Sequence, residues 1–302
     1  MEKLEYRFKK FISRKQNWYE FYIKDGFVCC CGDVIITDKD LVDGHLPFDF
    51  GKVDGYFYFY NCDSLTSIKG SPKEVGGDFR CIKCTSLTSL KGSPQEVGGN
   101  FYCIDCTSLT SLEGATQKVG VDFICHKCNS LTSLKGSPQT VGGDFYCSEC
   151  HSLTSLEGAP QKVGGDFYCS ECHSLTSLEG APQKVGRDFD CRMCTSLKSL
   201  KGAPQEVGRD FSCYNCTSLT SLKGSPKEVG SDFDCSWCEN LTSLDGCPEK
   251  VGGMFYFHNC DSLNPLISCP KKVIVDFDCS HCPSIPQLWG PSEKICGMLD
   301  CD

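Results

Sequence analysis

The sequence predicts a mainly β solenoid of about twelve stacked 22-residue coils, closed at its N-terminal end by a helical cap. The first observation is a strict period, because a β-branched apolar residue returns every 22 positions without insertion. The second is that each period holds a short strand-like alternation and several turn residues, but no long helix. Such self-similarity is typical of folds in which each repeat packs on its neighbours. The recurring residues are Val53, Val75, Val97, Val119, Val141, Val163, Val185, Val207, Val229, Val251, Val273 and Ile295.

The unit 75–96 shows how one coil is built. Two glycines follow Val75 and allow a turn, and Phe79-Arg80-Cys81 then alternates apolar, polar and apolar, as a short strand does. A Gly and a Pro near the end of the unit turn the chain toward the next coil. One coil cannot bury its own apolar side, so we expect coils to stack at about 4.8 Å around one continuous core. The residues expected inside are Phe79, Cys81, Cys84, Leu87, Leu90 and their equivalents in other coils.

The repeat also predicts the domain organisation. We expect an N-terminal cap over 1–31 and a solenoid over 32–302, made of a capping coil 32–52, eleven units over 53–294 and a truncated coil 295–302. The capping coil is a degenerate unit, with Ile35 one period before Phe57 and Leu46 one period before Ile68. Two units, 141–162 and 163–184, are identical, which indicates growth by duplication.

The first residues break the repeat and favour a helix. Leu4, Phe8, Phe11 and Ile12 have helical spacing in a basic segment, so an amphipathic helix is expected to cover the open end of the stack. A docking segment for another protein is the alternative.

The repeat resembles a known pattern. Phe79-x-Cys81-x-x-Cys84-x-x-Leu87 fits the leucine-rich repeat, and LTSLKGSPQEVGG resembles the 22-residue leucine-rich-repeat-like arrays of bacteriophage and bacterial proteins. The segment GDVIITDKDLVDGHLPFDFGKV resembles their opening coil, so the resemblance covers 32–302. It implies a recognition or structural surface without shared catalytic residues. Those arrays usually carry Asn where this chain has Cys84, and a thiol satisfies backbone groups poorly, so the cysteine needs a physical reason.

Charge and hydropathy restrict the partner. The net charge of -9 argues against nucleic acid and against an anionic membrane, and it favours a neutral or basic protein partner. The N-terminus is charged throughout and no run approaches 18 apolar residues, so we expect a cytoplasmic protein.

The 27 cysteines are the strongest compositional signal. We favour core filling by free thiols, since Cys packs as a small hydrophobe and Phe59 and Phe257 replace it in two coils. The alternatives are a Zn²⁺ or iron-sulfur site made by pairs on adjacent coils, and reversible disulfides. The paired positions are Cys81 and Cys84, Cys103 and Cys106, Cys125 and Cys128, Cys147 and Cys150, Cys169 and Cys172, Cys191 and Cys194, Cys213 and Cys216, Cys235 and Cys238, and Cys279 and Cys282.

Two further columns lie beside the strand. The residue before each strand Phe is usually acidic, as in Asp144 and Asp166, and we favour hydrogen bonding to the glycine-rich turn over a cation-attracting strip. The outward residue after each Phe is often tyrosine, which either anchors a partner or stacks across strands. The candidate binding face comprises Tyr58, Tyr102, Tyr146, Tyr168, Tyr256, Asp144 and Asp166.

These patterns favour a non-enzymatic protein. His151 and His173 are copies in duplicated coils and have no paired carboxylate, so no catalytic residue is assigned. We therefore expect a protein-binding or structural scaffold that needs no cofactor. The alternative is a metal-binding or redox-active cysteine ladder.

Overall fold

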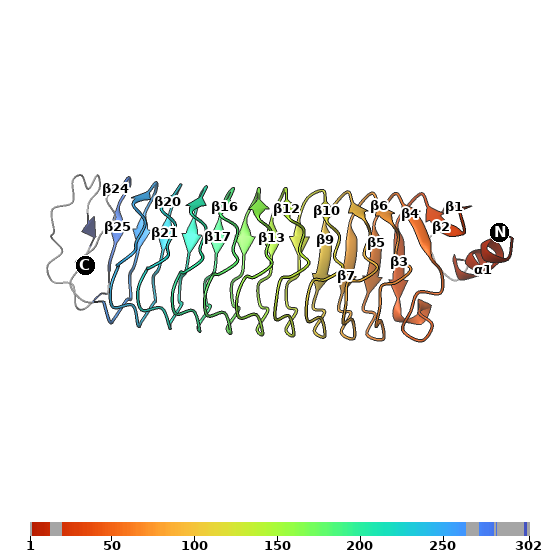
Figure 1. Cartoon of the computed structure of the whole chain (residues 1–302), viewed down its shortest axis with the longest axis horizontal. Coiled ribbons are helices and arrows are strands. Elements are labelled where there is room, and N and C mark those ends of the chain that lie inside the picture. The colour runs from red at the N-terminus through yellow and green to blue at the C-terminus, as the bar shows by residue number, and fades with distance from the viewer. Residues whose placement is uncertain (1, 13–19, 264–271, 281, 283–298, 301–302) are drawn as a thin grey trace. The chain divides into compact units, whose positions relative to one another are not determined.

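The structure is a computed structural model that describes residues 2–12, 20–263, 272–280, 282 and 299–300. Packing divides the chain into two compact units, 1–142 and 143–302, which are described separately. In both units successive coils contribute strands to parallel sheets (Figure 1). Ile295 and most of the last full unit after Cys282 lie outside the described residues.

The described residues of the first unit form one α-helix, one 3₁₀ turn and short strands. These are α1 (Glu2–Ile12), β1 (Phe21–Lys24), β2 (Phe27–Cys30), β3 (Val34–Thr37), η1 (Asp38–Asp40), β4 (Phe50–Val53), β5 (Phe57–Tyr60), β6 (Glu74–Val75), β7 (Phe79–Ile82), β8 (Glu96–Val97), β9 (Phe101–Ile104), β10 (Lys118–Val119), β11 (Phe123–Ile124) and β12 (Thr140–Val141). One sheet has the order β1-β2-β4-β6-β8-β10, and in the other β3, β5, β7, β9 and β11 follow one another.

The second unit repeats the same two strands per coil. These are β13 (Phe145–Tyr146), β14 (Lys162–Val163), β15 (Phe167–Tyr168), β16 (Lys184–Val185), β17 (Phe189–Asp190), β18 (Glu206–Val207), β19 (Phe211–Ser212), β20 (Glu228–Val229), β21 (Phe233–Asp234), β22 (Lys250–Val251), β23 (Phe255–Tyr256), β24 (Lys272–Val273), β25 (Phe277–Asp278) and β26 (Leu299–Asp300). Even-numbered strands from β14 to β24 pair in one sheet, and odd-numbered strands from β13 to β25, followed by β26, pair in the other.

The register equals the sequence period. Val163 pairs with Val185, and Phe167 pairs with Phe189, so equivalent residues of neighbouring coils lie side by side. The phenyl rings of Phe167 and Phe189 stack with centroids 5.2 Å apart and planes 7° apart. Identical side chains therefore form continuous columns, as the sequence predicts.

Both cysteines of a coil point inward because the residue between them and next to the second has a left-handed backbone conformation. In an unbroken strand, side chains three residues apart point to opposite faces. Here the residue before the second cysteine has a positive φ, as at Glu149 (55°) and Glu171 (58°), which bends the chain so that both cysteines of a coil point inward. The same conformation occurs at Asn61, Lys83, Asp105, Lys127, Met193, Asn215, Trp237 and Asn259.

The predicted core is confirmed. In the coil 163–184 the strand Phe, both cysteines and both leucines have no exposed surface. The turn that follows requires glycine, because Gly180 has φ 93° and a Cβ there would lie 2.5 Å from the backbone of Glu157.

The predicted register of the capping coil is wrong by one residue. Val34, not Ile35, pairs with Phe57, and Ile35 pairs with Tyr58. The pairing of β3 with β5 spans 23 residues, whereas the hydrogen bond from Thr66 N to Gly44 O again spans 22. The extra residue of the capping coil therefore lies between β3 and Gly44. The 3₁₀ turn η1 occupies this stretch and accounts for the difference.

The cap is only partly helical. The expected helix is present as α1, and its Phe8 is buried with ring centroids 4.9 Å from Phe21 and 5.3 Å from Phe48. Residues 21–30, however, form an antiparallel hairpin, because Asp25 and Gly26 both take positive φ and close a two-residue turn. Its second strand, β2, pairs in parallel with β4 and so extends the first sheet.

The architecture is thus a mainly β solenoid of parallel coils with one N-terminal helix, as predicted. Within the described ranges, no helix has the length and apolar character needed to span a bilayer.

Candidate binding face

The second cysteine of each coil forms a hydrogen-bonded ladder. Its thiol donates to the carbonyl of the first-cysteine position one coil earlier, as in Cys172 Sγ to Cys147 O (3.2 Å) and Cys194 Sγ to Cys169 O (3.2 Å). This gives the cysteine a physical role, because it satisfies a buried carbonyl. Equivalent bonds link Cys106 to Cys81, Cys128 to Cys103, Cys216 to Cys191, Cys238 to Cys213 and Cys260 to Cys235.

The ladder matters most where strands are short. In the coils with the four-residue strands β7 and β9, the thiols of Cys84 and Cys106 lie 3.9 and 3.5 Å from their acceptors. Thiols from coils with two-residue strands lie 3.0 to 3.3 Å away. Among the described residues, the only hydrogen bond to the Cys147 carbonyl comes from Cys172, so the thiol replaces a missing backbone donor.

Burial keeps the thiols protonated. It raises the pKa of Cys147, Cys169 and Cys213 well above the usual value, and it raises the pKa of Cys172 to about 12. Cys147, Cys169, Cys172 and Cys213 are free thiols.

The cysteines named as alternative metal ligands lie in the core. Cys150 is an example, since the positive φ of Glu149 turns its side chain inward, where it has no exposed surface. In the described ranges, no group of three or more His, Cys, Asp or Glu side chains is arranged to hold a metal ion. The full burial of Cys150 and its equivalents agrees with core filling. The metal alternative stays a prediction. The equivalents with the same full burial are Cys81, Cys84, Cys103, Cys106, Cys125, Cys128, Cys147, Cys169, Cys172, Cys191, Cys194, Cys213, Cys216, Cys235 and Cys238.

The acidic column is a second ladder. Asp144 Oδ1 accepts the Asp166 amide (2.8 Å), and Asp166 Oδ1 accepts the Asp188 amide (2.9 Å). We expected a local hydrogen bond to the glycine-rich turn. This prediction is wrong, because the carboxylate accepts an amide of the next coil. Asn100 at the same position accepts in the same way, since its side-chain oxygen accepts the Asp122 amide at 2.9 Å.

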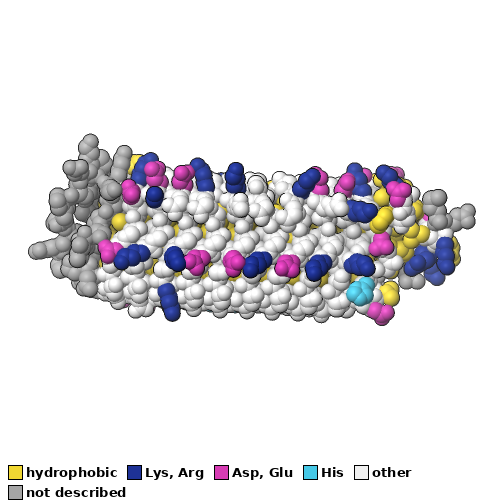
Figure 2. All heavy atoms as spheres, viewed as in Figure 1, with side chains coloured by type: hydrophobic (Ala, Val, Ile, Leu, Met, Phe, Trp, Pro, Cys, Tyr) yellow, Lys and Arg dark blue, Asp and Glu magenta, His cyan; other side chains and the backbone are white. Residues whose placement is uncertain are grey.

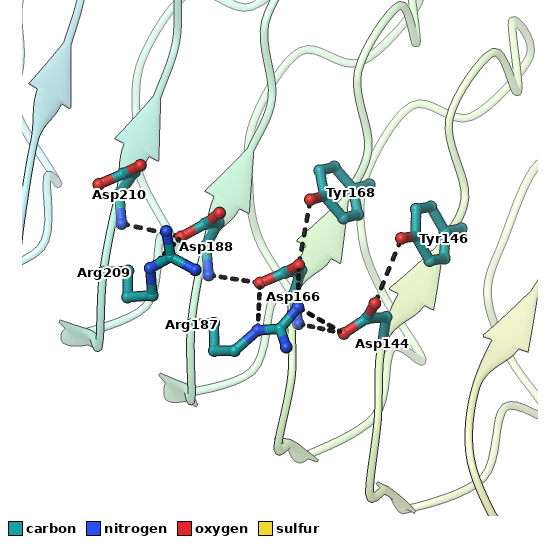
Figure 3. A network of polar contacts seen from close by, with 8 residues as sticks. All are labelled: Asp144, Tyr146, Asp166, Tyr168, Arg187, Asp188, Arg209 and Asp210. Atoms are coloured by element: carbon teal, nitrogen blue, oxygen red, sulfur yellow. Dashed lines mark hydrogen bonds and ion pairs between the residues drawn. The ribbon is translucent and has the colours of Figure 1, made fainter.

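The tyrosines of the duplicated coils are held by this acidic ladder. Tyr146 and Tyr168 stack with centroids 4.6 Å apart and planes 12° apart. Their hydroxyls donate to Asp144 Oδ2 (3.2 Å) and Asp166 Oδ2 (3.1 Å), respectively (Figure 3). Both residues are half-buried, and the stacking and the hydroxyl hydrogen bonds fix the orientation of their rings.

Arg187 joins the same network and was missed by the sequence reasoning. It donates to both oxygens of Asp166 (3.0 and 2.7 Å) and lies 3.7 Å from Asp144. Its guanidinium lowers the pKa of Asp166. Arg209 stands at the same position one coil later, 3.6 Å from Asp188 (Figure 3). The available signal was the second glycine of the repeat, which is Arg in these two coils.

In the first unit, Tyr58 and Tyr102 lie on either side of an arginine. Arg80 donates to Asp78 Oδ2 (2.6 Å), and its guanidinium carbon lies 5.8 Å from the Tyr58 ring and 5.1 Å from the Tyr102 ring. This arrangement combines a cation–π contact with a charge-assisted hydrogen bond.

Tyr256 differs from the other tyrosines. It pairs in register with Asp234 and with Asp278 on the flanking coils. The residue two before it is Met254, which offers no carboxylate, and no described residue hydrogen-bonds its hydroxyl. Burial and the surrounding carboxylates raise the pKa of Tyr256.

Other exposed acidic and basic side chains pair with one another. In Figure 2, basic and acidic side chains occur together in lengthwise rows over the described residues. Ion pairs between exposed side chains include Lys184–Glu206 and Lys201–Glu179, both 2.7 Å. Exposed pairs of this kind contribute little to stability.

No known family model matches the chain, and no curated protein sequence matches it. A solved leucine-rich repeat protein from Bacteroides ovatus is similar to 87% of this chain over 93% of its own length, at 15% identity and a TM-score of 0.27. An identity and a TM-score this low support no conclusion about this chain. Its class of protein is therefore inferred from its own geometry. That geometry defines a β-solenoid repeat protein with an aromatic and acidic outer face.

Proposed function

We propose that the protein is a non-enzymatic scaffold that binds another protein through this outer face. The observation that carries the proposal is the fixed pair Tyr146–Tyr168. The two rings stack on each other and are hydrogen-bonded to Asp144 and Asp166, yet both residues remain half-exposed. Rigid, half-exposed tyrosines supply contact area at low cost in conformational entropy, which is why they are enriched among binding anchors.

The test compares two pairs of substitutions in the same two coils. Tyr146→Ala with Tyr168→Ala removes both rings. Thr154→Ala with Thr176→Ala is the matched control, because these threonines are exposed and belong to the same coils. A partner enriched on the immobilised wild-type chain is purified, and its dissociation constant is measured by calorimetry for the three proteins.

We expect the tyrosine variant to bind about ten-fold or more weakly, as loss of two anchors of about 1 kcal/mol each implies. The threonine variant should bind like the wild type. Circular dichroism checks that all three are folded. If the tyrosine variant binds within two-fold of wild type, the partner uses another face and the proposal is wrong.

A further inference from the structure

We propose that the outer face around Tyr256 docks an arginine side chain from a basic, extended segment of the partner protein. The inference names the partner's chemistry for the face described above, and so it rests on the proposed function. It is argued from an unneutralised stretch of the face and from an arginine that the chain itself places on the equivalent column.

The column that contains Arg187 and Arg209 has no further arginine in the coils around Tyr256. Arg187 pairs with the Asp 21 residues earlier, and Arg209 lies beside its equivalent. The next residues of that column are Ser231, Gly253 and Val275, which carry no charge. Among the described residues, no Lys or Arg forms an ion pair with the carboxylates that follow. These are Asp210, Asp232, Asp234 and Asp278.

Two of these carboxylates flank one aromatic ring, that of Tyr256. Asp234 and Asp278 are the register neighbours of Tyr256 on the two adjacent strands. Each uses Oδ1 to accept the amide two residues later, Ser236 N at 2.9 Å and Ser280 N at 3.0 Å, which fixes its orientation. Asp278 Oδ2 lies 3.5 Å from the ring nitrogen of His258, and the Tyr256 hydroxyl has no hydrogen-bond partner in the described part of the chain. The face therefore offers a half-buried ring flanked by fixed negative charges.

The chain shows what such a column does with a guanidinium. Arg80 occupies the same column in the first unit, between two tyrosine rings and on the carboxylate of Asp78. At Tyr256 the described residues provide the ring and the carboxylates but no arginine. In the proposed complex the partner provides the arginine. Arginine fits better than lysine because its planar guanidinium stacks on a ring while it donates to carboxylates at its edge.

The test uses fluorescein-labelled tetra-arginine as the probe, with tetra-lysine and tetra-citrulline as comparison peptides. Fluorescence anisotropy at low ionic strength gives dissociation constants for the full chain and its variants. Tyr256→Ala removes the ring. Asp234→Asn with Asp278→Asn removes two charges but keeps the oxygens that accept the Ser236 and Ser280 amides. Glu157→Gln with Glu179→Gln is the matched control, because it removes two charges from an exposed column of the same unit.

We expect tetra-arginine to bind about three-fold more tightly than tetra-lysine, and tetra-citrulline not to bind. Tyr256→Ala should weaken tetra-arginine binding about three-fold and abolish the preference for arginine. The double Asp variant should lose about five-fold or more, whereas the double Glu variant should stay within two-fold of wild type.

Equal losses in the Asp and Glu variants would show general charge attraction and overturn the inference. An unchanged affinity in Tyr256→Ala would also overturn it. Because the peptide measurement does not involve the natural partner, it can fail while Tyr146 and Tyr168 still prove necessary for partner binding. The proposed function would then stand without this docking position.

Discussion

The thiol ladder predicts that the two cysteines of one coil differ in their value to stability. In coil 163–184, Cys169 and Cys172 are both fully buried. Cys172 donates to the Cys147 carbonyl, whereas Cys169 Sγ donates to no described residue. Substituting each in turn by Ala therefore removes the same atoms, but only Cys172→Ala leaves a buried carbonyl without a donor.

The expected magnitudes follow from burial and hydrogen bonding. Loss of a buried group of this size costs about 0.8 kcal/mol in transfer free energy. A residual cavity of roughly 20 Å³ adds about 0.5 kcal/mol. Cys169→Ala should therefore cost about 1.3 kcal/mol. Cys172→Ala should cost at least about 1 kcal/mol more, because an orphaned buried acceptor carries a desolvation penalty.

The assay is amide hydrogen exchange of coil 163–184 with a reductant present, supported by urea denaturation. Exchange reports the local opening free energy, which is preferable here because a long repeat array need not unfold in one step. Equal losses for the two variants, within about 0.3 kcal/mol, would refute the ladder as a stabilising element.

Two further results are expected. The melting temperature should stay within about 1 °C in strong chelator, because the buried thiols remain protonated and metals bind thiolates. Zinc or iron that co-purifies at about one ion per two coils, or unfolding by chelator, would instead support the metal alternative. Asp166→Asn should lower stability at pH 7, since Arg187 depresses the pKa of Asp166 in the folded state. This contribution is present above the unfolded pKa of about 3.9 and is lost as pH falls through the folded pKa, so wild type and variant should converge in acid. A stability difference that is constant from pH 7 to pH 2 would contradict this assignment.

The columns of the fold follow from the sequence because the period never slips. A spacing of 22 residues between Val163 and Val185 becomes a register of the same length, and the burial of Phe, Cys and Leu follows from it. The capping coil shows the limit of this argument. Its degenerate residues allow two alignments with the next coil, and an apolar pattern alone does not reveal one extra residue in a 3₁₀ turn. The hairpin at 21–30 did have a signal, since Asp25-Gly26 lies between two apolar stretches.

The outer face was harder to predict because its chemistry depends on contacts between coils. The sequence places Asp144 and Tyr146 on one strand, but it does not show that the carboxylate accepts an amide 22 residues later and also binds the tyrosine hydroxyl. Likewise, the low value of a thiol as a hydrogen-bond donor argued against cysteine at the ladder position. The structure shows a carbonyl 25 residues earlier that has no other donor among the described residues.

Both ladders run in one direction along the chain. Each coil offers its predecessor a thiol proton and an amide, and it offers its successor a carbonyl and a carboxylate oxygen. The two edges of a coil are therefore complementary under simple translation, like the two sides of a building block. A copied segment such as 163–184 meets the same chemistry on both sides as the coil that it duplicates. Arrays of this type can therefore lengthen by whole units of 22 residues without compensating changes elsewhere.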